Sequence, residues 1–264
     1  MTEAVSAPPD GAGGRGDAAA PTLRAAGLVM DFQGVRALDG VDLELAAGEV
    51  LGLIGPNGSG KTTCLNVLSG FIVATAGRVG LDAQDVTAWS PARRVRAGLT
   101  RTFQGARLFG ALTVRENVEV AFCTQRLRGR EVERRTDELL LRLGLGQFAE
   151  TLARSLPGGV ERRLGIARAL ATEPQFLLLD EPAAGLNEQE GEELVATIRA
   201  LAADHECGVL LVEHDMRVIT AACDRVQVLD SGRPIARGTP AEVRSDPAVL
   251  AAYFGQREAD ARDS

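Results

Sequence analysis

The feature that most constrains the fold is a short glycine-rich segment, Gly55-Pro56-Asn57-Gly58-Ser59-Gly60-Lys61-Thr62, which follows the apolar run Val50–Ile54. Its form, G-x-x-x-x-G-K-[ST], is that of a phosphate-binding loop between a buried strand and a helix. Glycines at these places let successive backbone N–H groups wrap an anion, and the helix N-terminus adds a favourable dipole. The segment therefore predicts an α/β fold with a phosphate site.

Lys61 is the only lysine in a chain that has 29 lysines and arginines together. Most surface positions accept either basic residue, so a lone lysine is expected where a compact ammonium is required. In a phosphate loop Lys61 would bridge the β- and γ-phosphates of a nucleotide, Thr62 would hold Mg²⁺, and Thr63 would add a contact. The strand-to-helix context argues against the alternative, an ordinary glycine-rich turn.

A second candidate motif is the apolar run Phe176–Leu179 followed by Asp180 and Glu181. Carboxylates at the carboxyl end of a parallel strand are typical of nucleotide sites. Asp180 would act on Mg²⁺ through its water shell, and Glu181 would polarise the attacking water. Acidic residues after a strand can also be simple helix caps, and the phosphate loop upstream disfavours that interpretation.

Short apolar runs divided by turns predict strands, and amphipathic segments predict helices. The alternation of the two indicates a largely parallel sheet with a helical insertion. Residues 1–21 form a flexible tail rich in Ala, Gly and Pro, and residues 256–264 are expected to fray. Strands are expected over 23–32, 41–45, 50–54, 99–103, 176–180 and 209–213, and helices after Lys61 and over 114–122, 131–143, 158–170 and 190–202.

The composition excludes several classes of protein. A net charge of -7 argues against nucleic-acid binding, which needs a basic face. The apolar runs fall short of the roughly 20 residues that cross a bilayer as a helix. The N-terminus has no secretory signal pattern, so a cytoplasmic chain is expected. The four cysteines, Cys64, Cys123, Cys207 and Cys223, are scattered and are expected to be reduced, without zinc.

Three further positions make the order of motifs specific: Gln104 after a predicted strand, Gly158-Gly159 at a helix start, and His214 after a strand. This order resembles the nucleotide-binding domain of ATP-binding cassette (ABC) proteins, over residues 22–255. The resemblance implies a P-loop NTPase fold with a mostly parallel core sheet, an antiparallel β subdomain and a helical subdomain inserted over about residues 105–160. It also implies ATP and Mg²⁺ as cofactors, with two ATPs sandwiched in a dimer.

The same resemblance assigns roles to single residues. Gln104 would sense Mg²⁺ and water and relay closure to a membrane partner, and His214 would contact the γ-phosphate. Gly158 and Gly159 would present free N–H groups to the γ-phosphate held by the partner subunit. Phe32 is the candidate to stack on adenine, with a core aromatic as the alternative.

The signature loop departs from the family's usual form, LSGGQ. Pro157 stands where Ser is usual, and Val160 where Gln is usual. Our hypothesis is that this signature loop still closes on the partner's nucleotide but stabilises the transition state of hydrolysis less. The dimer-contact loop ends in Asn187 where Asp is more common, which weakens the case for a cross-site role.

Several stretches are similar to the ATPases of branched-chain amino acid importers, including Arg101–Gln104, Arg107–Phe109 and Glu213–Met216. That resemblance implies a peripheral ATPase on the cytoplasmic membrane face, two permeases, a sister ATPase or a second copy as partner, and an extracytoplasmic binding protein. Related importers carry urea, other amides or aromatic acids. Arg107-Leu108-Phe109 suits a groove for a permease helix, with an ordinary packed turn as the alternative.

Three other functions remain open. A lipopolysaccharide-export ATPase has a similar sequence, although its signature tends to keep the Ser that Pro157 replaces. A soluble ABC ATPase acting on DNA or ribosomes usually carries long inserts or two cassettes. A P-loop kinase would leave Gly158-Gly159 and His214 unexplained.

Overall fold

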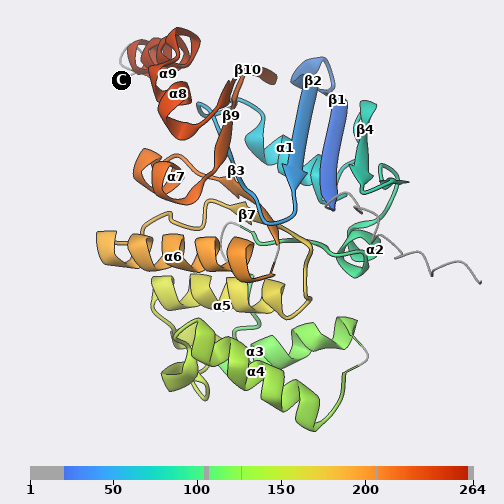
Figure 1. Ribbon diagram of the computed structural model, residues 1–264, viewed down its shortest axis with the longest axis vertical. Coiled ribbons are helices and arrows are strands. Elements are labelled where there is room, and N and C mark those ends of the chain that lie inside the picture. Colours follow the sequence, from blue (N-terminus) through green and yellow to red (C-terminus); the bar gives the residue numbers. More distant parts are fainter. Residues whose placement is uncertain (1–20, 104–106, 126, 206, 261–264) are drawn as a thin grey trace, which may run out of the picture.

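The computed structural model describes residues 21–103, 107–125, 127–205 and 207–260 (Figure 1). Apart from Pro21, the expected N-terminal tail lies outside the described residues, and so does Gln104.

Two sheets organise the described chain. The central sheet has the order β10-β9-β3-β8-β7-β6, and all its neighbouring pairs are parallel except β10 with β9. The second sheet, in the order β2-β1-β4-β5, is antiparallel throughout. The strands are β1 (Thr22–Phe32), β2 (Val35–Ala46), β3 (Val50–Ile54), β4 (Ala76–Leu81), β5 (Gln84–Asp85), β6 (Leu99–Arg101), β7 (Phe176–Asp180), β8 (Gly208–Val212), β9 (Arg225–Asp230) and β10 (Arg233–Gly238).

Helices lie on both sides of the central sheet (Figure 1). The pair α3 and α4 forms a separate layer at the end of the molecule opposite α9, with α5 next to it. The helices are α1 (Lys61–Leu68), α2 (Pro91–Arg96), α3 (Val114–Ala121), α4 (Arg130–Arg142), α5 (Gly158–Leu170), α6 (Glu188–His205), α7 (Met216–Ala222), α8 (Pro240–Ser245) and α9 (Pro247–Asp260).

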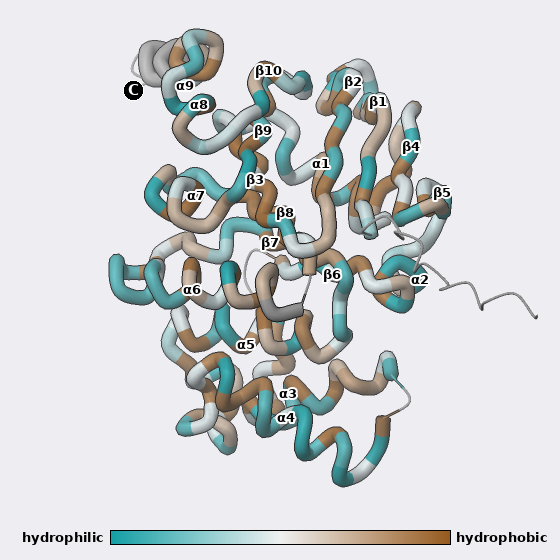
Figure 2. The backbone as a smooth tube through the Cα atoms, viewed as in Figure 1, coloured by the Kyte–Doolittle hydropathy of each residue, from teal (hydrophilic) through white to brown (hydrophobic). Residues whose placement is uncertain are grey.

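The strand β7 shows how the central sheet is stabilised. All five of its residues are buried, because both faces of the sheet are covered. Side chains alternate between the faces, so Phe176 and Leu178 join a core with α1 and the antiparallel sheet. Leu177 and Leu179 join the opposite core with α6 and α7. Figure 2 shows the same apolar character along β3 and β7.

The helical insertion has a core of its own. Val114 and Val118 of α3, Leu140 of α4 and Leu164 of α5 meet in one buried cluster. The helix α3 begins with a capping box, in which the Thr113 side chain accepts a hydrogen bond from the Glu116 N–H while the Glu116 side chain accepts one from the Thr113 N–H. The structure therefore confirms the predicted fold: a mostly parallel core sheet, an antiparallel β subdomain and a helical insertion.

Several elements were not predicted from the sequence: β4, β5, β9 and β10, and the short helices α2, α7 and α8. The strand β4, for example, has three exposed residues and pairs with Leu23 and its neighbours, far away in the sequence. Its partner cannot be read from local periodicity. The helix α9 continues past residue 255, the boundary drawn from the sequence.

The two-sided core predicts a large difference between two leucines. Leu178→Ala should lower the free energy of unfolding by about 2–5 kcal/mol, since it leaves a cavity between β7 and α1. Leu141→Ala removes the same atoms from a side chain that is 81% exposed on α4 and should change stability by less than about 0.5 kcal/mol. Urea unfolding followed by circular dichroism measures both, and equal losses would contradict this packing.

Candidate nucleotide site

The glycine-rich loop connects β3 to α1 through backbone conformations that favour glycine. Gly60 precedes α1 with a φ of 103°, and a Cβ there would lie 2.5 Å from the Ala37 carbonyl oxygen. A Cβ at Gly55 would lie 2.1 Å from the carbonyl oxygen of Leu229. Neither position accepts a side chain, so the two glycines are required for the loop to close against its neighbours.

The ammonium of Lys61 lies inside this loop. Its Nζ donates hydrogen bonds to the carbonyl oxygens of Gly55 and Pro56, at 2.7 and 2.8 Å. Burial lowers the pKa of Lys61, while the negative charges of Glu181 and Asp180 oppose that shift. The loop therefore keeps a positive charge next to the two predicted carboxylates.

Two residues from the C-terminal part of the chain support the loop. The N–H of Gly232 donates to the Ser59 carbonyl at 3.0 Å. The Tyr253 hydroxyl accepts a hydrogen bond from the Gly55 N–H, which opposes the rise that burial causes in the pKa of Tyr253. Neither residue was predicted from the sequence to belong to the site. Tyr253 is the only tyrosine in the chain, and that was the one available signal.

Asp180 ends β7 and forms an ion pair with Arg101, which ends the adjacent strand β6. Arg101 Nη2 donates to Asp180 Oδ2 at 2.7 Å, and the two side chains are 5% and 7% exposed. Asp180 lies at the strand end as predicted, whereas no role of its own was predicted for Arg101.

The next strand, β8, is followed by a buried carboxylate that the sequence analysis did not use. Glu213 accepts hydrogen bonds from the N–H groups of Ala183 and His214, at 2.6 and 3.1 Å. Burial raises the pKa of Glu213, and these N–H groups oppose the rise. The Glu181 N–H donates to the Val212 carbonyl at 2.9 Å, so the turns after β7 and β8 hold each other in place.

Two predicted site residues have exposed side chains. The His214 imidazole is 64% exposed, with Nδ1 at 3.7 Å from Glu213 Oε2. Phe32 ends β1 and is 44% exposed, so the alternative of a core aromatic is excluded. Their exposure leaves both rings accessible to a ligand, and their predicted contacts with nucleotide stay predictions.

The glycine pair begins α5, where Pro157 is the N-cap residue and makes no side-chain hydrogen bond. A Cβ at Gly159 would lie 2.4 Å from Glu190 Oε1. Glu190 itself accepts from the Asn187 N–H at 3.0 Å, so the dimer-contact loop of the sequence analysis packs against the signature. Val160 is buried in the core of the helical insertion, and its replacement of Gln therefore removes no ligand-facing group.

The topology explains how the main motifs meet. The strands β3, β8 and β7 are neighbours and parallel, so their carboxyl ends reach the same edge of the sheet. The loop 55–63, Glu213-His214 and Asp180-Glu181 follow these three ends. Gly159, in the glycine pair, instead lies beside Glu190 at the start of α6. The structure thus brings the predicted phosphate, acid and histidine positions to one edge, which is where α/β sheets bind ligands.

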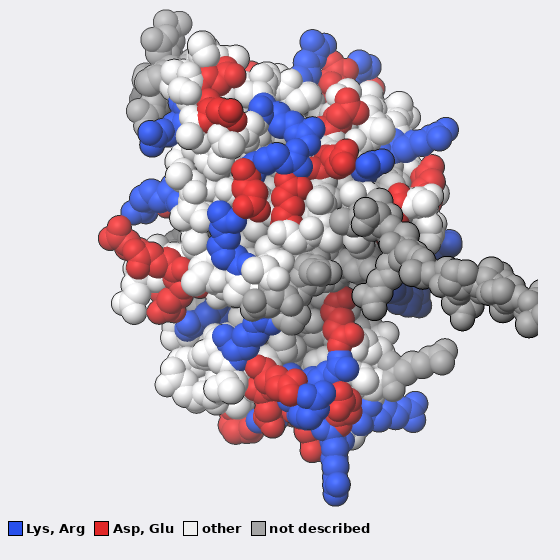
Figure 3. Space-filling model, in the orientation of Figure 1, with Lys and Arg blue, Asp and Glu red and all other residues white. Residues whose placement is uncertain are grey.

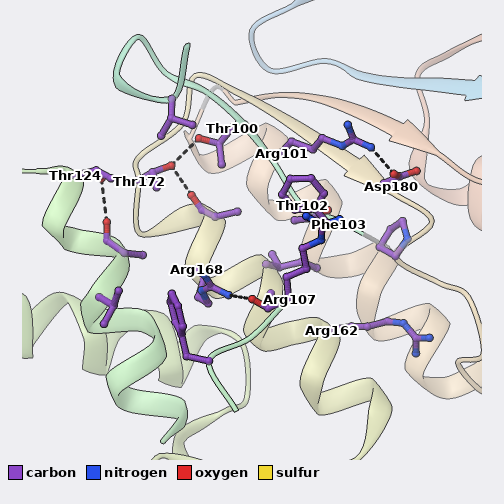
Figure 4. Close-up of a pocket in the computed structure, with 18 of the residues that line it drawn as sticks. Thr100, Arg101, Thr102, Phe103, Arg107, Thr124, Arg162, Arg168, Thr172 and Asp180 are labelled. Carbon is purple, nitrogen blue, oxygen red and sulfur yellow. Dashed lines mark hydrogen bonds and ion pairs between the residues drawn. The ribbon is translucent and has the colours of Figure 1, made fainter. Parts of the chain in front are cut away.

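A cavity of about 330 Å³ opens beside this edge (Figure 4). The guanidiniums of Arg101 and Arg107 lie 5.1 and 4.5 Å from the centre of the Phe103 ring. Arg168 lies 4.9 Å from the centre of the Phe109 ring. The cavity therefore runs from Asp180 to the helical insertion, where its lining includes Phe109, Val120, Ala121 and Thr124.

A phosphate loop, an acid-terminated strand and a buried ammonium at one sheet edge define a nucleotide-binding P-loop ATPase. Residues 38–184 match the family model described as ABC transporter, and residues 233–259 match one described as Branched-chain amino acid ATP-binding cassette transporter. The chain therefore belongs to the ABC transporter family.

Similar proteins and similar solved structures belong to the same family. The chain is 41% identical to the high-affinity branched-chain amino acid transport ATP-binding proteins BraF of Pseudomonas aeruginosa and LivG of Escherichia coli, over 89% of this chain and 98% of theirs. The lipopolysaccharide export system ATP-binding protein LptB of Escherichia coli is 35% identical over the same shares. The ADP conformation of the ATP-binding cassette MJ1267 matches with a TM-score of 0.82 and 31% identity, over 89% of this chain and 99% of that one.

The contacts of Lys61 predict a severe effect of its removal. Lys61→Ala should weaken ATP binding by at least about ten-fold and abolish turnover, because the loop loses its charge for the phosphates. Arg78→Ala, which removes the same charge from an exposed position on β4, is the matched control. Calorimetric ATP titration and phosphate release measure the two effects, and an active Lys61→Ala chain would show that another group holds the phosphates.

Because Pro157, the N-cap residue of α5, makes no side-chain hydrogen bond, a serine in its place is predicted to raise ATP turnover. Pro157→Ser should raise turnover at saturating ATP by about ten-fold, since one hydrogen bond to a charged group contributes about 1.5 kcal/mol or more. Val160→Gln, the other reversion toward the usual signature, should lower the melting temperature without raising turnover, because Val160 is a core residue. An unchanged rate in Pro157→Ser would count against the hypothesis.

Proposed function

We propose that this chain is the ATP-hydrolysing subunit of an importer for branched-chain amino acids or a related small polar substrate such as another amino acid, an amide or urea. The observation that carries the proposal is the match of residues 233–259 to the branched-chain model, beyond the general ABC match. The 41% identity to BraF and LivG over 89% of the chain supports the same substrate class.

The proposed cofactor beside ATP is Mg²⁺, held by Thr62 and Asp180 with Gln104 as a third contact. A hydroxyl and a carboxylate are hard oxygen donors of the kind that Mg²⁺ takes, with its other positions filled by phosphates and water. Residues 21–103, 107–125, 127–205 and 207–260 contain no cluster of three or more His, Cys, Asp or Glu that could hold a metal by itself. The donors present therefore fit an ion that arrives with the nucleotide, which would neutralise phosphate charge.

The catalytic roles follow from the same edge of the sheet. Glu181 would orient and polarise the water that attacks the γ-phosphate, and His214 would contact that phosphate. Gln104 would sense Mg²⁺ and the water, and would transmit closure of the site to a membrane partner. Two hydrogen bonds hold the turn that carries Glu181. The Glu181 N–H donates to the Val212 carbonyl, and the Ala183 N–H donates to the Glu213 carboxylate. Glu213 would thus position the catalytic carboxylate without touching the nucleotide.

Hydrolysis would require two cassettes, this chain with a second copy or with a sister ATPase. Gly158 and Gly159 would reach the nucleotide of the partner. A solved relative in dimeric form, MJ0796 bound to ADP and Pi, matches this chain with a TM-score of 0.76 and 28% identity. The coverage is 83% of this chain and 98% of that one. Closure and opening of this dimer would drive transport.

The membrane partners would be permease subunits, with an extracytoplasmic binding protein further along the system, and no nucleic acid is expected. Within the described residues, none of the helices is long and apolar enough to cross a membrane. The similarity to transport ATP-binding proteins supports the proposal that the chain is a peripheral subunit on the cytoplasmic membrane face. Figure 3 shows basic and acidic side chains mixed over α4 on the face in view.

Phe109 is the proposed contact with a permease helix. Its ring is exposed, while its backbone N–H and carbonyl are both bonded to the buried Asn117 side chain, at 2.9 and 3.1 Å. An aromatic ring presented by a rigid turn at the mouth of a cavity is a typical docking feature. The relationship to LptB keeps lipopolysaccharide export as the second candidate.

One experiment tests the proposed assembly. Glu181→Gln should bind ATP without hydrolysing it and accumulate the closed dimer, because a ligand that binds only the dimer stabilises it by mass action. Its purification in mild detergent with ATP, followed by mass spectrometry, should recover two permeases and a sister ATPase. Adding Phe109→Asp should remove the permeases and leave the dimer intact.

Other outcomes would redirect the proposal. Recovery of lipopolysaccharide-export membrane subunits would favour the second candidate. Only ribosomal or DNA-bound partners would make the chain a soluble ABC ATPase, and a monomer in the presence of ATP would contradict the sandwich.

A further inference from the structure

Arg101 connects three parts of the nucleotide site through one guanidinium group. Nη2 donates to Asp180 Oδ2 at 2.7 Å, and Nη1 donates to Asn66 Oδ1 at 2.6 Å. Nη1 also lies 3.3 Å from Ser69 Oγ. Figure 4 shows the Arg101 side chain extended toward Asp180 along one end of the cavity. The contacts join the end of β6 to β7 and to the helix that follows the phosphate loop.

The position of Asn66 makes this connection relevant to the metal. Asn66 lies four residues after Thr62 on α1, so the two share one face of the helix. Thr62 and Asp180 are the two described residues that we assign to Mg²⁺. The guanidinium therefore holds Asp180 directly and holds the helix of Thr62 through Asn66.

Burial makes the arrangement rigid. The Arg101 and Asp180 side chains are 5% and 7% exposed, so neither charge is compensated well by water. Loss of one partner in a buried pair leaves the other charge unpaired, which is strongly unfavourable. A planar guanidinium presents several N–H donors in fixed directions, so it binds an aspartate and an asparagine at once, and a lysine ammonium on a flexible stem does not reproduce that geometry.

We propose that Arg101 is a positioning residue for ATP hydrolysis, whose guanidinium fixes the distance between Asp180 and the Thr62 helix so that both hold the same Mg²⁺–nucleotide. The proposal rests on the Mg²⁺ site proposed above. Arg101 touches neither phosphate nor water in this role, and acts through Asp180 and Asn66. Its effect should therefore appear in turnover and not in the binding of metal-free ATP, which depends on the loop around Lys61.

The test uses the full chain with Arg101→Met, Arg101→Lys, Asn66→Ala and the Arg101→Met/Asn66→Ala double variant. Arg96→Met, which removes the same charge from an exposed position on α2, is the matched control. ATP affinity is measured in EDTA by calorimetry, turnover is measured at saturating ATP and Mg²⁺, and melting temperatures set an assay temperature at which every variant is folded.

Turnover should fall by at least about ten-fold in both Arg101 variants, because the spacing of two metal-holding groups is lost. Affinity for ATP in EDTA should stay within about two-fold of the parent, since Lys61 and its loop are unchanged. Asn66→Ala should lose less, and the double variant should be no slower than Arg101→Met, because both changes break one network.

Three results would overturn the proposal. Parental turnover in Arg101→Lys would mean that charge alone suffices. Metal-free affinity that weakens in step with turnover would indicate a purely structural role. If the losses of turnover in the two single variants multiply in the double variant, Asn66 and Arg101 act independently. A parent that hydrolyses ATP equally well in EDTA would instead contradict the Mg²⁺ site itself.

Discussion

The covered faces of the central sheet are the constraint on which the rest of the structure depends. Every residue of β3, β7 and β8 is buried, because helices cover one face while α1 and the antiparallel sheet cover the other. Such strands have no room for polar side chains along their length until they end. The polar groups of the site therefore gather at the carboxyl edge, where the phosphate loop, Asp180 and Glu213 follow three neighbouring strands.

Three charged groups at this edge, Lys61, Asp180 and Glu213, are buried, and each has a specific partner. Lys61 is bonded to two loop carbonyls, Asp180 to Arg101, and Glu213 to two backbone N–H groups. A buried charge without such partners would lower the free energy of unfolding by several kcal/mol. The net stability of a typical domain is only about 5–15 kcal/mol. These pairings fix the turns after β7 and β8 before any ligand binds, so the site is organised by its own electrostatics.

The helical insertion adds a second level of organisation. Its core is separate from the two cores of the sheet, and α5 contributes to it through Val160 and Leu164. On the side toward the sheet, Ile166 of the same helix belongs to the core beneath β7. One helix thus links the glycine pair at its start to both units, and the cavity with Phe103 and Phe109 lies where they meet. A partner bound there would contact residues adjacent to Asp180.

The sequence by itself determined the site's chemistry and the central elements. The loop Gly55–Thr62, the run Phe176–Asp180 and the glycine pair at 158–159 are local patterns, because a phosphate loop, a buried strand and a helix start each need particular residues in a row. They predicted the fold class and the positions of Lys61, Asp180 and Glu181. The strand β4 escaped prediction because its partner β1 is remote in the chain. The strands β9 and β10 also escaped prediction, although they pair with each other across the turn Ser231-Gly232.

Only the tertiary structure decided which polar residues serve the site. Nothing in the local sequence distinguishes Arg101, Glu213 and Tyr253 from their neighbours. The fold brings them into contact with Asp180, Ala183 and Gly55, respectively. Val160 showed the reverse: it looked like a lost ligand contact and proved to be a core residue. The physical reason is that hydrogen bonds and burial are properties of neighbours in space, and a sequence specifies those neighbours only through the whole fold.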